Sequence, residues 1–389
     1  MRRARSITPG NEETRQKTLE TWLILAVSFG ALFLVAFGSP DVRQHETDFL
    51  SFYSGARLVG TPHLYSLQHA REIQTQVSHP EGVLAYVRLP FYAAVLWPLG
   101  QLPYVTALSL WLTLNIAGLA GFIWLWTPRL TSVLLCCWFF PVWLNFGSGQ
   151  DVPLMLCAVA LGSWLLSRDK PYLAGLAFAL CSAKFHLFFL LPVFLLARRL
   201  WRCTAGFGTG GALLLVLSFL AGGRNWPLDF YSTIHTTGIL DVSAKMPNLY
   251  GLLHGLPLAG GWIAILSLLV VGATWYAVRR MPLRDALAVA VAGGLLVSLH
   301  AYLYDCALLL PLLLVLEDRL GWSKLVKIFI AISLASLTLP LPSVSWIGQV
   351  CVIALFTSAI YMAWRSGAGS LARPSPGSSG RTRSVPSGK

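Results

Sequence analysis

A carboxylate, a cation and aromatic side chains fall within the short stretch Glu46–Arg57, directly after the first apolar segment. If this stretch is helical, Tyr53 and Arg57 lie near one face and Asp48 lies at the N-terminal end. A charged group at a membrane is costly unless it has a partner or a function. Asp48 is therefore the candidate catalytic residue, as a general base that accepts the proton of a hydroxyl group. The alternative is an N-cap, in which Asp48 accepts hydrogen bonds from the first amides of the helix.

Two further groups of polar residues interrupt apolar runs in the middle of the chain. Lys184 and His186 lie in a short hinge, where they could donate hydrogen bonds to a lipid phosphate. Alternatively, the lysine only extends its ammonium group to the lipid headgroups. Gln150 and Asp151 end a tight turn between two predicted helices, where the amide could bind a sugar hydroxyl. The alternative is a simple connector in which Asp151 caps the next helix.

The densest later group is Ser298–Asp305, which contains an imidazole, two tyrosines and a carboxylate. His300 and Tyr304 are four residues apart and would share a helical face. An aromatic belt at the membrane surface explains the tyrosines, but not the neighbouring His300 and Asp305. We therefore predict that this group belongs to a site. Asn248, in a long loop with aromatic and amide side chains, is a further candidate for sugar binding.

The composition indicates that these residues belong to a membrane protein. Of 389 residues, 56% are hydrophobic and only 12% are charged, and 15 are Trp. This apolar content is far too high for a soluble domain of this length. The seven cysteines lie in or beside apolar runs and form no CxxC pair. The sequence therefore supports neither a disulfide framework nor a cysteine metal site.

Apolar runs predict an all-α polytopic fold with about twelve membrane spans. The N-terminal segment 1–20 precedes a membrane domain at 21–365, which includes large loops at 38–104 and 222–259. Within the first loop, the short run 89–102 is broken by prolines, as is typical of a re-entrant or interfacial helix. The predicted spans are 22–37, 105–126, 131–146, 152–167, 171–183, 187–198, 204–221, 260–277, 285–299, 304–316, 324–340 and 346–364, of which the fifth and sixth could form one broken element.

The distribution of charge predicts the orientation. With the N-terminus in the cytoplasm, most of the 29 Lys and Arg residues fall on cytoplasmic segments, as the positive-inside rule requires. Asp48, Asp151 and Asp305 then fall on the extracytoplasmic side. The net charge of +13 is thus a topological signal, and nucleic acid binding is not expected. The tail 366–389, rich in Ser, Gly, Pro and Arg, is expected to be cytoplasmic and disordered.

Taken in order, these pieces resemble the polytopic GT-C class of glycosyltransferases, and specifically glycosyltransferase family 87, the mannosyltransferase-like group. The resemblance extends over roughly residues 46–315 and rests on order and spacing rather than on one motif. The chain departs from the family pattern at Leu299, where a proline is frequent, and at Arg88–Pro90, where the family has an aromatic residue and two prolines. The matching pieces are Asp48-Phe49 with Tyr53, Gly55, Ala56 and Arg57; Leu64-Tyr65; Arg88-Leu89-Pro90-Phe91-Tyr92; Pro98-Leu99; Leu102-Pro103; Trp111 with Asn115; Gly149-Gln150; Ala183-Lys184; Asn248-Leu249-Tyr250-Gly251; and Ser298-Leu299-His300 with Tyr304-Asp305.

The resemblance implies an extracytoplasmic enzyme that takes a mannose-like hexose from a polyprenyl-phosphate carrier. A single displacement would transfer the sugar, with inversion, to a lipid or glycan acceptor. Asp48 matches the family's first-loop acidic residue, thought to be the base. Lys184 and His300 match polar positions that face the same cavity. His300 becomes a second catalytic candidate, either as a hydrogen-bond donor to the phosphate or as a partner that orients Asp48.

The remaining candidates are expected to hold the donor and the acceptor. The phosphate is placed near Lys184 and either Arg57 or Arg88, since positive charge stabilises it as it leaves. Because these cations can replace a divalent ion, we expect no cofactor and no essential metal, although nearby carboxylates keep a metal possible. His186 is the fourth residue expected to bind the donor phosphate. The residues expected to bind the sugar and the acceptor are Tyr53, Gln150, Asp151, Asn248, Tyr304 and Asp305.

Two rival functions fit the sequence less well. A lipid-linked-sugar flippase or small-solute transporter would require polar residues deep in the spans, whereas the predicted spans are nearly free of midplane charge. A structural scaffold has no use for the Asp48 and His300 groups. The expected partners are therefore a donor, an acceptor and membrane lipids. The expected form is a monomer in a bacterial-type plasma (inner) membrane, with both termini in the cytoplasm.

Overall fold

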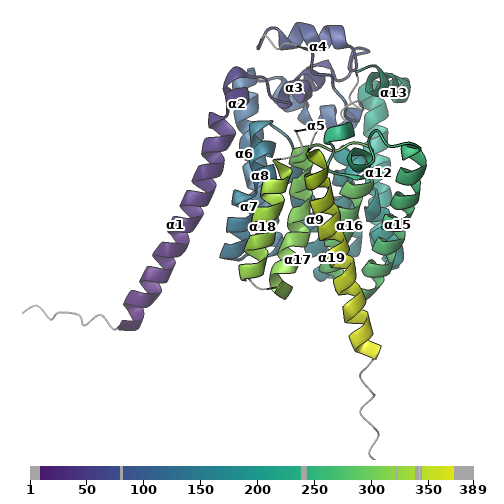
Figure 1. Cartoon of the computed structure of the whole chain (residues 1–389). Helices are drawn as coiled ribbons and strands as arrows, with labels where there is room; N and C mark the ends of the chain where they lie inside the picture. Colours follow the sequence, from purple (N-terminus) through teal and green to yellow (C-terminus); the bar gives the residue numbers. More distant parts are fainter. Residues whose placement is uncertain are drawn as a thin grey trace, which may run out of the picture.

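The computed structural model describes residues 9–78, 82–237, 243–320, 322–337, 341 and 344–371. Every regular element within these ranges is a helix, and none is a strand, which confirms the all-α class. The long helices stand side by side in a bundle, and short helices cover one end of it (Figure 1). The elements are α1 Pro9–Gly38, α2 Pro40–Gln44, α3 Phe49–Leu58, α4 Leu67–Gln74, α5 Pro90–Gly100, α6 Tyr104–Trp126, α7 Leu130–Trp138, α8 Phe140–Gly147, α9 Val152–Ser167, α10 Pro171–Ala179, η1 Leu180–Leu187, α11 Leu190–Ala197, α12 Trp201–Gly222, α13 Trp226–Thr236, η2 Ser243–Lys245, α14 Leu249–Leu252, α15 Ala259–Arg280, α16 Leu283–Val297, η3 Leu303–Leu309, α17 Leu310–Leu320, α18 Trp322–Ser336 and α19 Ser345–Leu371.

Five helices of the described chain are long and apolar enough to cross a bilayer: α1, α6, α12, α15 and α19. A sixth span arises if α7 and α8, which meet at a bend of 57°, act as one. The bend follows from Pro141 in the first turn of α8, because a proline there cannot continue the ladder of α7. The chain is therefore a helical membrane protein with several spans. The count of twelve stays a prediction.

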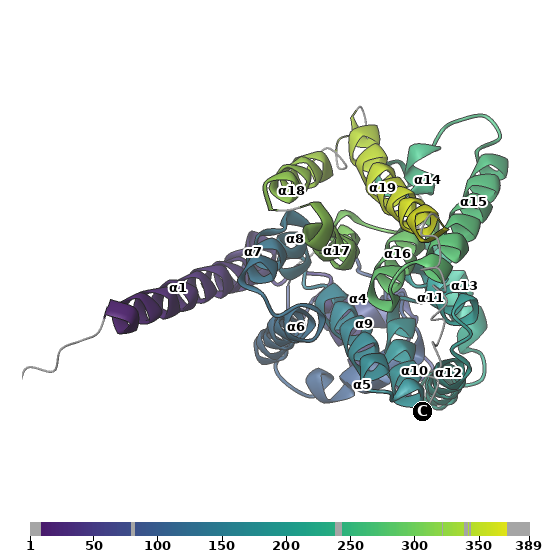
Figure 2. The same ribbon diagram turned by 90° about the horizontal axis from the view of Figure 1, so that it is seen from below.

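Helix α1 lies partly apart from the bundle. It contacts α7 and α8, but its N-terminal half extends away from them in both views (Figures 1 and 2). The apolar side chains of this half, including Trp22 and Leu23, are exposed. In a membrane they contact lipid rather than water. At the other end of the chain, α19 ends at Leu371, and the rest of the predicted tail lies outside the described residues.

The short helices α2 to α5 form one end of the molecule, together with α13 (Figure 1). Helix α5 has 11 residues and spans only about 16 Å, too little to cross a bilayer. It packs between α3 and α12, and the hydroxyl of Ser218 on α12 accepts the backbone N–H of Phe91 at 3.2 Å. The first residues of the apolar run 89–102 are therefore buried among other helices of this end, whereas Val95 and Trp97 are exposed.

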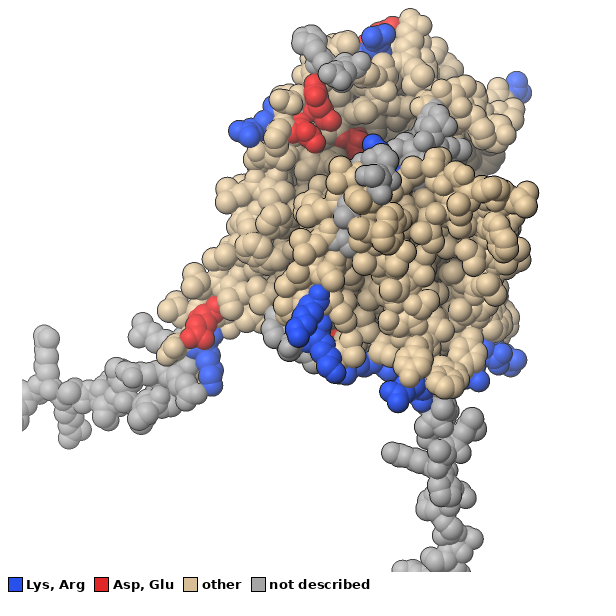
Figure 3. All heavy atoms as spheres, viewed as in Figure 1, with Lys and Arg blue, Asp and Glu red and all other residues tan. Residues whose placement is uncertain are grey.

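Basic side chains are distributed unevenly along the bundle. On the face seen in Figure 3, Lys and Arg gather at the end opposite to the short helices. Near the short helices the surface is hollowed, and acidic and basic atoms are visible inside the recess. The gathering of Lys and Arg at that end agrees with the charge pattern used to predict orientation. The assignment of the two ends to cytoplasm and exterior stays a prediction.

The closest helix crossing in the bundle depends on small residues. Where α10 meets α12, a Cβ on Gly206 would lie 2.0 Å from the carbonyl oxygen of Tyr172, and one on Gly175 would lie 2.0 Å from that of Cys203. Glycine lets the two backbones approach closely, and the resulting van der Waals packing favours helix association in membranes. This crossing holds α10, and with it the adjoining η1, against the bundle.

We expect Gly206→Ala to destabilise the protein by about 1–3 kcal/mol, because the added methyl group meets backbone that must move. The measurement is the midpoint of thermal unfolding in detergent. The matched control is Gly208→Ala on the same helix, where a Cβ meets nothing within 4 Å. Equal midpoints for the two variants would show that the crossing tolerates a larger residue.

Candidate active site

Five segments from distant parts of the sequence meet beneath the short helices. They are the start of α3, the loop before α5, the turn between α8 and α9, the 3-10 segment η1 and the start of η3. Each contributes one or two of the polar residues singled out in the sequence. The candidates from the first loop, the middle of the chain and its later part are therefore brought together.

Asp48 occupies the N-cap position of α3, but its side chain makes no capping hydrogen bond. The carboxylate points instead toward the α8–α9 turn, where Oδ2 accepts a hydrogen bond from Nε2 of Gln150 at 2.7 Å. The backbone N–H of Asp48 donates to the carbonyl of Ser148 at 2.9 Å, which fastens α3 to the same turn. Capping therefore does not explain this aspartate.

The backbone conformation of the α8–α9 turn is held by contacts that do not involve the side chains of Gln150 and Asp151. Gly149 has φ +65°, a conformation that favours glycine, and a Cβ there would press on Phe49 and Thr47. The indole N–H of Trp111 donates to the carbonyl of Gly149 at 2.8 Å. As a result, Gln150 is held at one place and in one direction.

Gln150 joins three parts of the site. Its Nε2 donates to Asp48 and, at 3.1 Å, to the hydroxyl of Tyr304. Its Oε1 accepts from the guanidinium of Arg88 at 3.3 Å. The side chain is only 5% exposed, so these bonds are made largely out of contact with solvent. A glutamine proposed to bind sugar thus has its amide engaged by protein groups.

Arg88 lies over the rings of Phe52 and Tyr92, at 5.3 and 5.9 Å from their centroids. Its guanidinium forms an ion pair of 3.4 Å with Asp151 and donates to the carbonyl of Ala183 at 3.4 Å. Its buried Nε has no hydrogen-bond partner within the described chain. This orphan donor points to a missing partner or water, because buried donors are normally satisfied.

Asp151 and Asp305 share Lys184. The ammonium group lies 3.2 Å from Oδ1 of Asp151 and 2.7 Å from Oδ1 of Asp305. Asp151 also accepts a 2.7 Å bond from the hydroxyl of Tyr92, and Asp305 accepts the backbone N–H of Tyr302 at 2.8 Å. The positive charges of Arg88 and Lys184 lower the pKa of the buried Asp151 to about 2.

The charges of this network balance, with two cations against two buried carboxylates. Asp48 lies beside it and adds one negative charge, yet no ion pair between described residues includes it. Burial raises the pKa of Asp48 above its ordinary value, although Gln150, Lys184 and Arg88 act in the opposite direction. A raised pKa means that the ionised carboxylate is a stronger base than an exposed one.

His300 and His186 face each other at the edge of the network, with ring centroids 6.3 Å apart. Burial lowers the pKa of His300 to about 4, so its ring is neutral at neutral pH. Its Nδ1 is buried without a hydrogen-bond partner in the described part of the protein. A neutral imidazole can donate or accept one hydrogen bond, but it brings no charge to a phosphate.

Three sequence candidates lie outside this network. Tyr53 donates its hydroxyl to the carbonyl of Leu102 at 2.8 Å, and the exposed Arg57 contacts the hydroxyl and ring of Tyr53. Asn248 caps α14 by accepting from the N–H of Gly251, and its amide donates to the carbonyl of Ser298. Its contact with the His300 loop is therefore structural support. Their proposed contacts with donor or acceptor stay predictions.

Two residues that contact the buried ion network were given no role by the sequence analysis. Tyr92 was matched to the family only as part of a motif, yet it bonds Asp151 directly. The ring of Phe52 lies 5.3 Å from the guanidinium of Arg88, in a cation–π contact. Both were visible as aromatic residues near charged ones. Nothing in their local sequence indicated the residues from other segments that they contact.

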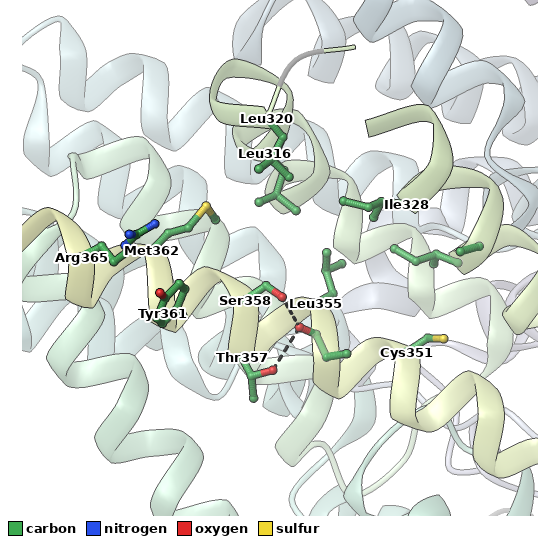
Figure 4. A pocket seen from close by; sticks show the side chains of 13 residues that line it. Leu316, Leu320, Ile328, Cys351, Leu355, Thr357, Ser358, Tyr361, Met362 and Arg365 are labelled. Atoms are coloured by element: carbon green, nitrogen blue, oxygen red, sulfur yellow. Dashed lines mark hydrogen bonds between the residues drawn. The ribbon is translucent and has the colours of Figure 1, made fainter. Parts of the chain in front are cut away.

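A second hollow, of about 710 Å³, lies between α17, α18 and α19 (Figure 4). Its lining is mainly apolar, with Arg365 and Tyr361 toward the C-terminal end of α19, and it includes no carboxylate among the described residues. Hydrocarbon suits such a hollow better than a sugar does. Within the described ranges, no three His, Cys, Asp or Glu side chains are arranged to hold a metal ion, and metal independence stays a prediction.

Comparison with known proteins supports the family resemblance seen in the sequence. The model of glycosyltransferase family 87 matches residues 89–304, more than half of the chain. No curated protein and no solved structure gave a match. The matched range includes Gln150, Asp151, Lys184 and His300, and it begins just after Arg88. The chain therefore belongs to glycosyltransferase family 87 and is a membrane glycosyltransferase.

Proposed function

We propose that this enzyme transfers a hexose from a polyprenyl-phosphate carrier to a hydroxyl group of a lipid or glycan, on the extracytoplasmic face. The observation that carries the proposal is the state of Asp48. It is partly buried, hydrogen-bonded by a fixed amide and free of any ion pair with the described residues. A base for a neutral hydroxyl needs these properties, since an ion-paired carboxylate would be a weaker proton acceptor.

The reaction is a single displacement at the anomeric carbon. The acceptor oxygen attacks this carbon while its proton passes to Asp48, and the bond from the carbon to the phosphate oxygen breaks. The electron pair leaves with the polyprenyl phosphate. One displacement inverts the anomeric configuration. The total charge of the site is unchanged, because the charge lost by the protonated carboxylate is gained by the phosphate.

The buried ion network supplies the positive side of the site. Arg88 and Lys184 are shared with Asp151 and Asp305, so an incoming phosphate competes with these carboxylates for the same donors. The unpartnered Nε of Arg88 is the donor that a phosphate oxygen could take without breaking a pair. We therefore favour Arg88 as the first phosphate contact over Arg57, which is exposed and contacts Tyr53 rather than the buried network.

The experiment is a transfer assay with the purified protein in detergent or vesicles. Polyprenyl-phosphate mannose, glucose and arabinose serve as donors, and membrane-lipid extracts serve as acceptors. We expect one lipid-phosphate sugar to be consumed, with a new glycosidic bond of inverted configuration in the product. Nucleotide sugars are the control donors. Transfer from a nucleotide sugar alone, or retention of configuration, would contradict the proposal.

A further inference from the structure

We propose that Gln150 is a positioning residue that aims the carboxylate of Asp48, and that Arg88 sets the direction in which its amide points. This inference rests on the proposed function, because it concerns the base of that reaction. It replaces the sequence-based role of Gln150, which was to bind a sugar hydroxyl.

The orientation of the amide is determined from both ends. A guanidinium only donates hydrogen bonds, so the Gln150 atom facing Arg88 at 3.3 Å must be the oxygen. An ionised carboxylate only accepts, so the atom facing Asp48 at 2.7 Å must be the nitrogen. The two neighbours therefore require the same arrangement. Reversing the amide would place two acceptors against each other and two donors against each other.

The locked amide discriminates between the two forms of the base. Its N–H stabilises the ionised carboxylate, whereas its oxygen, engaged by Arg88, cannot accept a proton from the neutral acid. Tyr304 accepts the second N–H of the amide at 3.1 Å, so no rotation is left to the group. Gln150 thus favours the charged form of Asp48 and holds one of its oxygens in place, while burial acts in the opposite direction.

Charged and titratable side chains from three neighbouring segments also act on Asp48. Lys184 of η1 and Arg88 of the loop before α5 lower its pKa through their charge, and Tyr304 lowers it as a hydrogen-bond partner. Tyr302, beside η3, also lies within electrostatic reach of the carboxylate. Lys184 and Arg88 are both paired with other carboxylates, which leaves Gln150 as the strongest single partner of Asp48.

The test compares Gln150→Met and Gln150→Glu with the wild type. Methionine keeps the volume but donates no hydrogen bond, and we expect the acid limb of kcat/KM to move up by about 1–2 pH units. Glutamate should move it further, because a second carboxylate would face Asp48. Substrate KM should change less than kcat. The sign follows from the chemistry, since the base is active only when it is ionised and activity is lost as the pH falls through its pKa.

A second readout needs no sugar transfer. The infrared carbonyl band of the protonated Asp48, identified by its absence in Asp48→Asn, should titrate at a higher pH in Gln150→Met. This measurement decides the inference even if the transferase assay fails. The matched control is Gln74→Met, which removes a buried glutamine bonded to Ser54 and Leu84 but not to Asp48. It should lower stability without moving the band. Wild-type titration of Asp48 in folded Gln150→Met would overturn the inference.

Discussion

Asp48→Asn is expected to reduce the transfer rate by about 10²- to 10⁴-fold, the usual contribution of a general base. Asparagine can still accept the hydrogen bond from Gln150 and still allows the backbone bond to Ser148, so the fold should survive. It has no affinity for the acceptor proton. The measurement is kcat in the transfer assay, together with the thermal unfolding midpoint of the same preparation.

Glu46→Gln is the control for this variant. Glu46 is an exposed carboxylate two residues before Asp48, so its neutralisation changes the local charge equally. We expect its activity to stay within about twofold of the wild type, since it is not part of the hydrogen-bond network. Full activity in Asp48→Asn would remove the base assignment. Equal losses in both variants would indicate an effect of surface charge instead.

The second large effect is expected at Lys184, and on stability rather than on chemistry alone. Lys184→Met leaves Asp151 and Asp305 buried with only Arg88 to compensate two charges. Removing one partner of a buried ion pair costs about 3–5 kcal/mol. We therefore expect a marked fall in the unfolding midpoint as well as loss of transfer. A simple loss of activity in this variant cannot be read as loss of phosphate binding.

The compensating variant separates the two effects. Lys184→Met combined with Asp305→Asn removes one charge of each sign, and the network is again balanced. We expect this double variant to recover part of the lost stability. If it recovers stability but not transfer, the Lys184–Asp305 pair also contributes to the reaction. The control is Lys170→Met at an exposed position, and an unfolding midpoint of Lys184→Met equal to that of Lys170→Met would contradict the role of the buried network.

The sequence supplied the candidates for the reacting groups. Asp48 stood out because a carboxylate beside an apolar segment is costly, and His300 and Asp305 stood out because an aromatic belt does not explain them. The helical class followed from apolar content. These conclusions depend only on residue type and local spacing, so they needed no knowledge of contacts.

Helix length was predicted less well. The runs 171–183 and 187–198 appear in the structure as α10 and α11, joined by η1 with a non-helical backbone at Lys184. The sequence left two alternatives open, two spans or one broken element with a hinge at Lys184, because the same apolar residues suit a straight span and a bent one. The break is nevertheless what aims the lysine at Asp151 and Asp305.

Residue types and their local spacing thus determined by themselves that the protein is a helical membrane protein, and they indicated which groups are candidates for its chemistry. Only the tertiary structure decided how these groups divide their work. It engaged the Lys184 and Arg88 charges with carboxylates, turned the amide of Gln150 toward Asp48 and left Arg57 outside. The physical reason is that each pairing joins residues tens or hundreds of positions apart, and the pairing with the best geometry and burial is selected only when the helices pack.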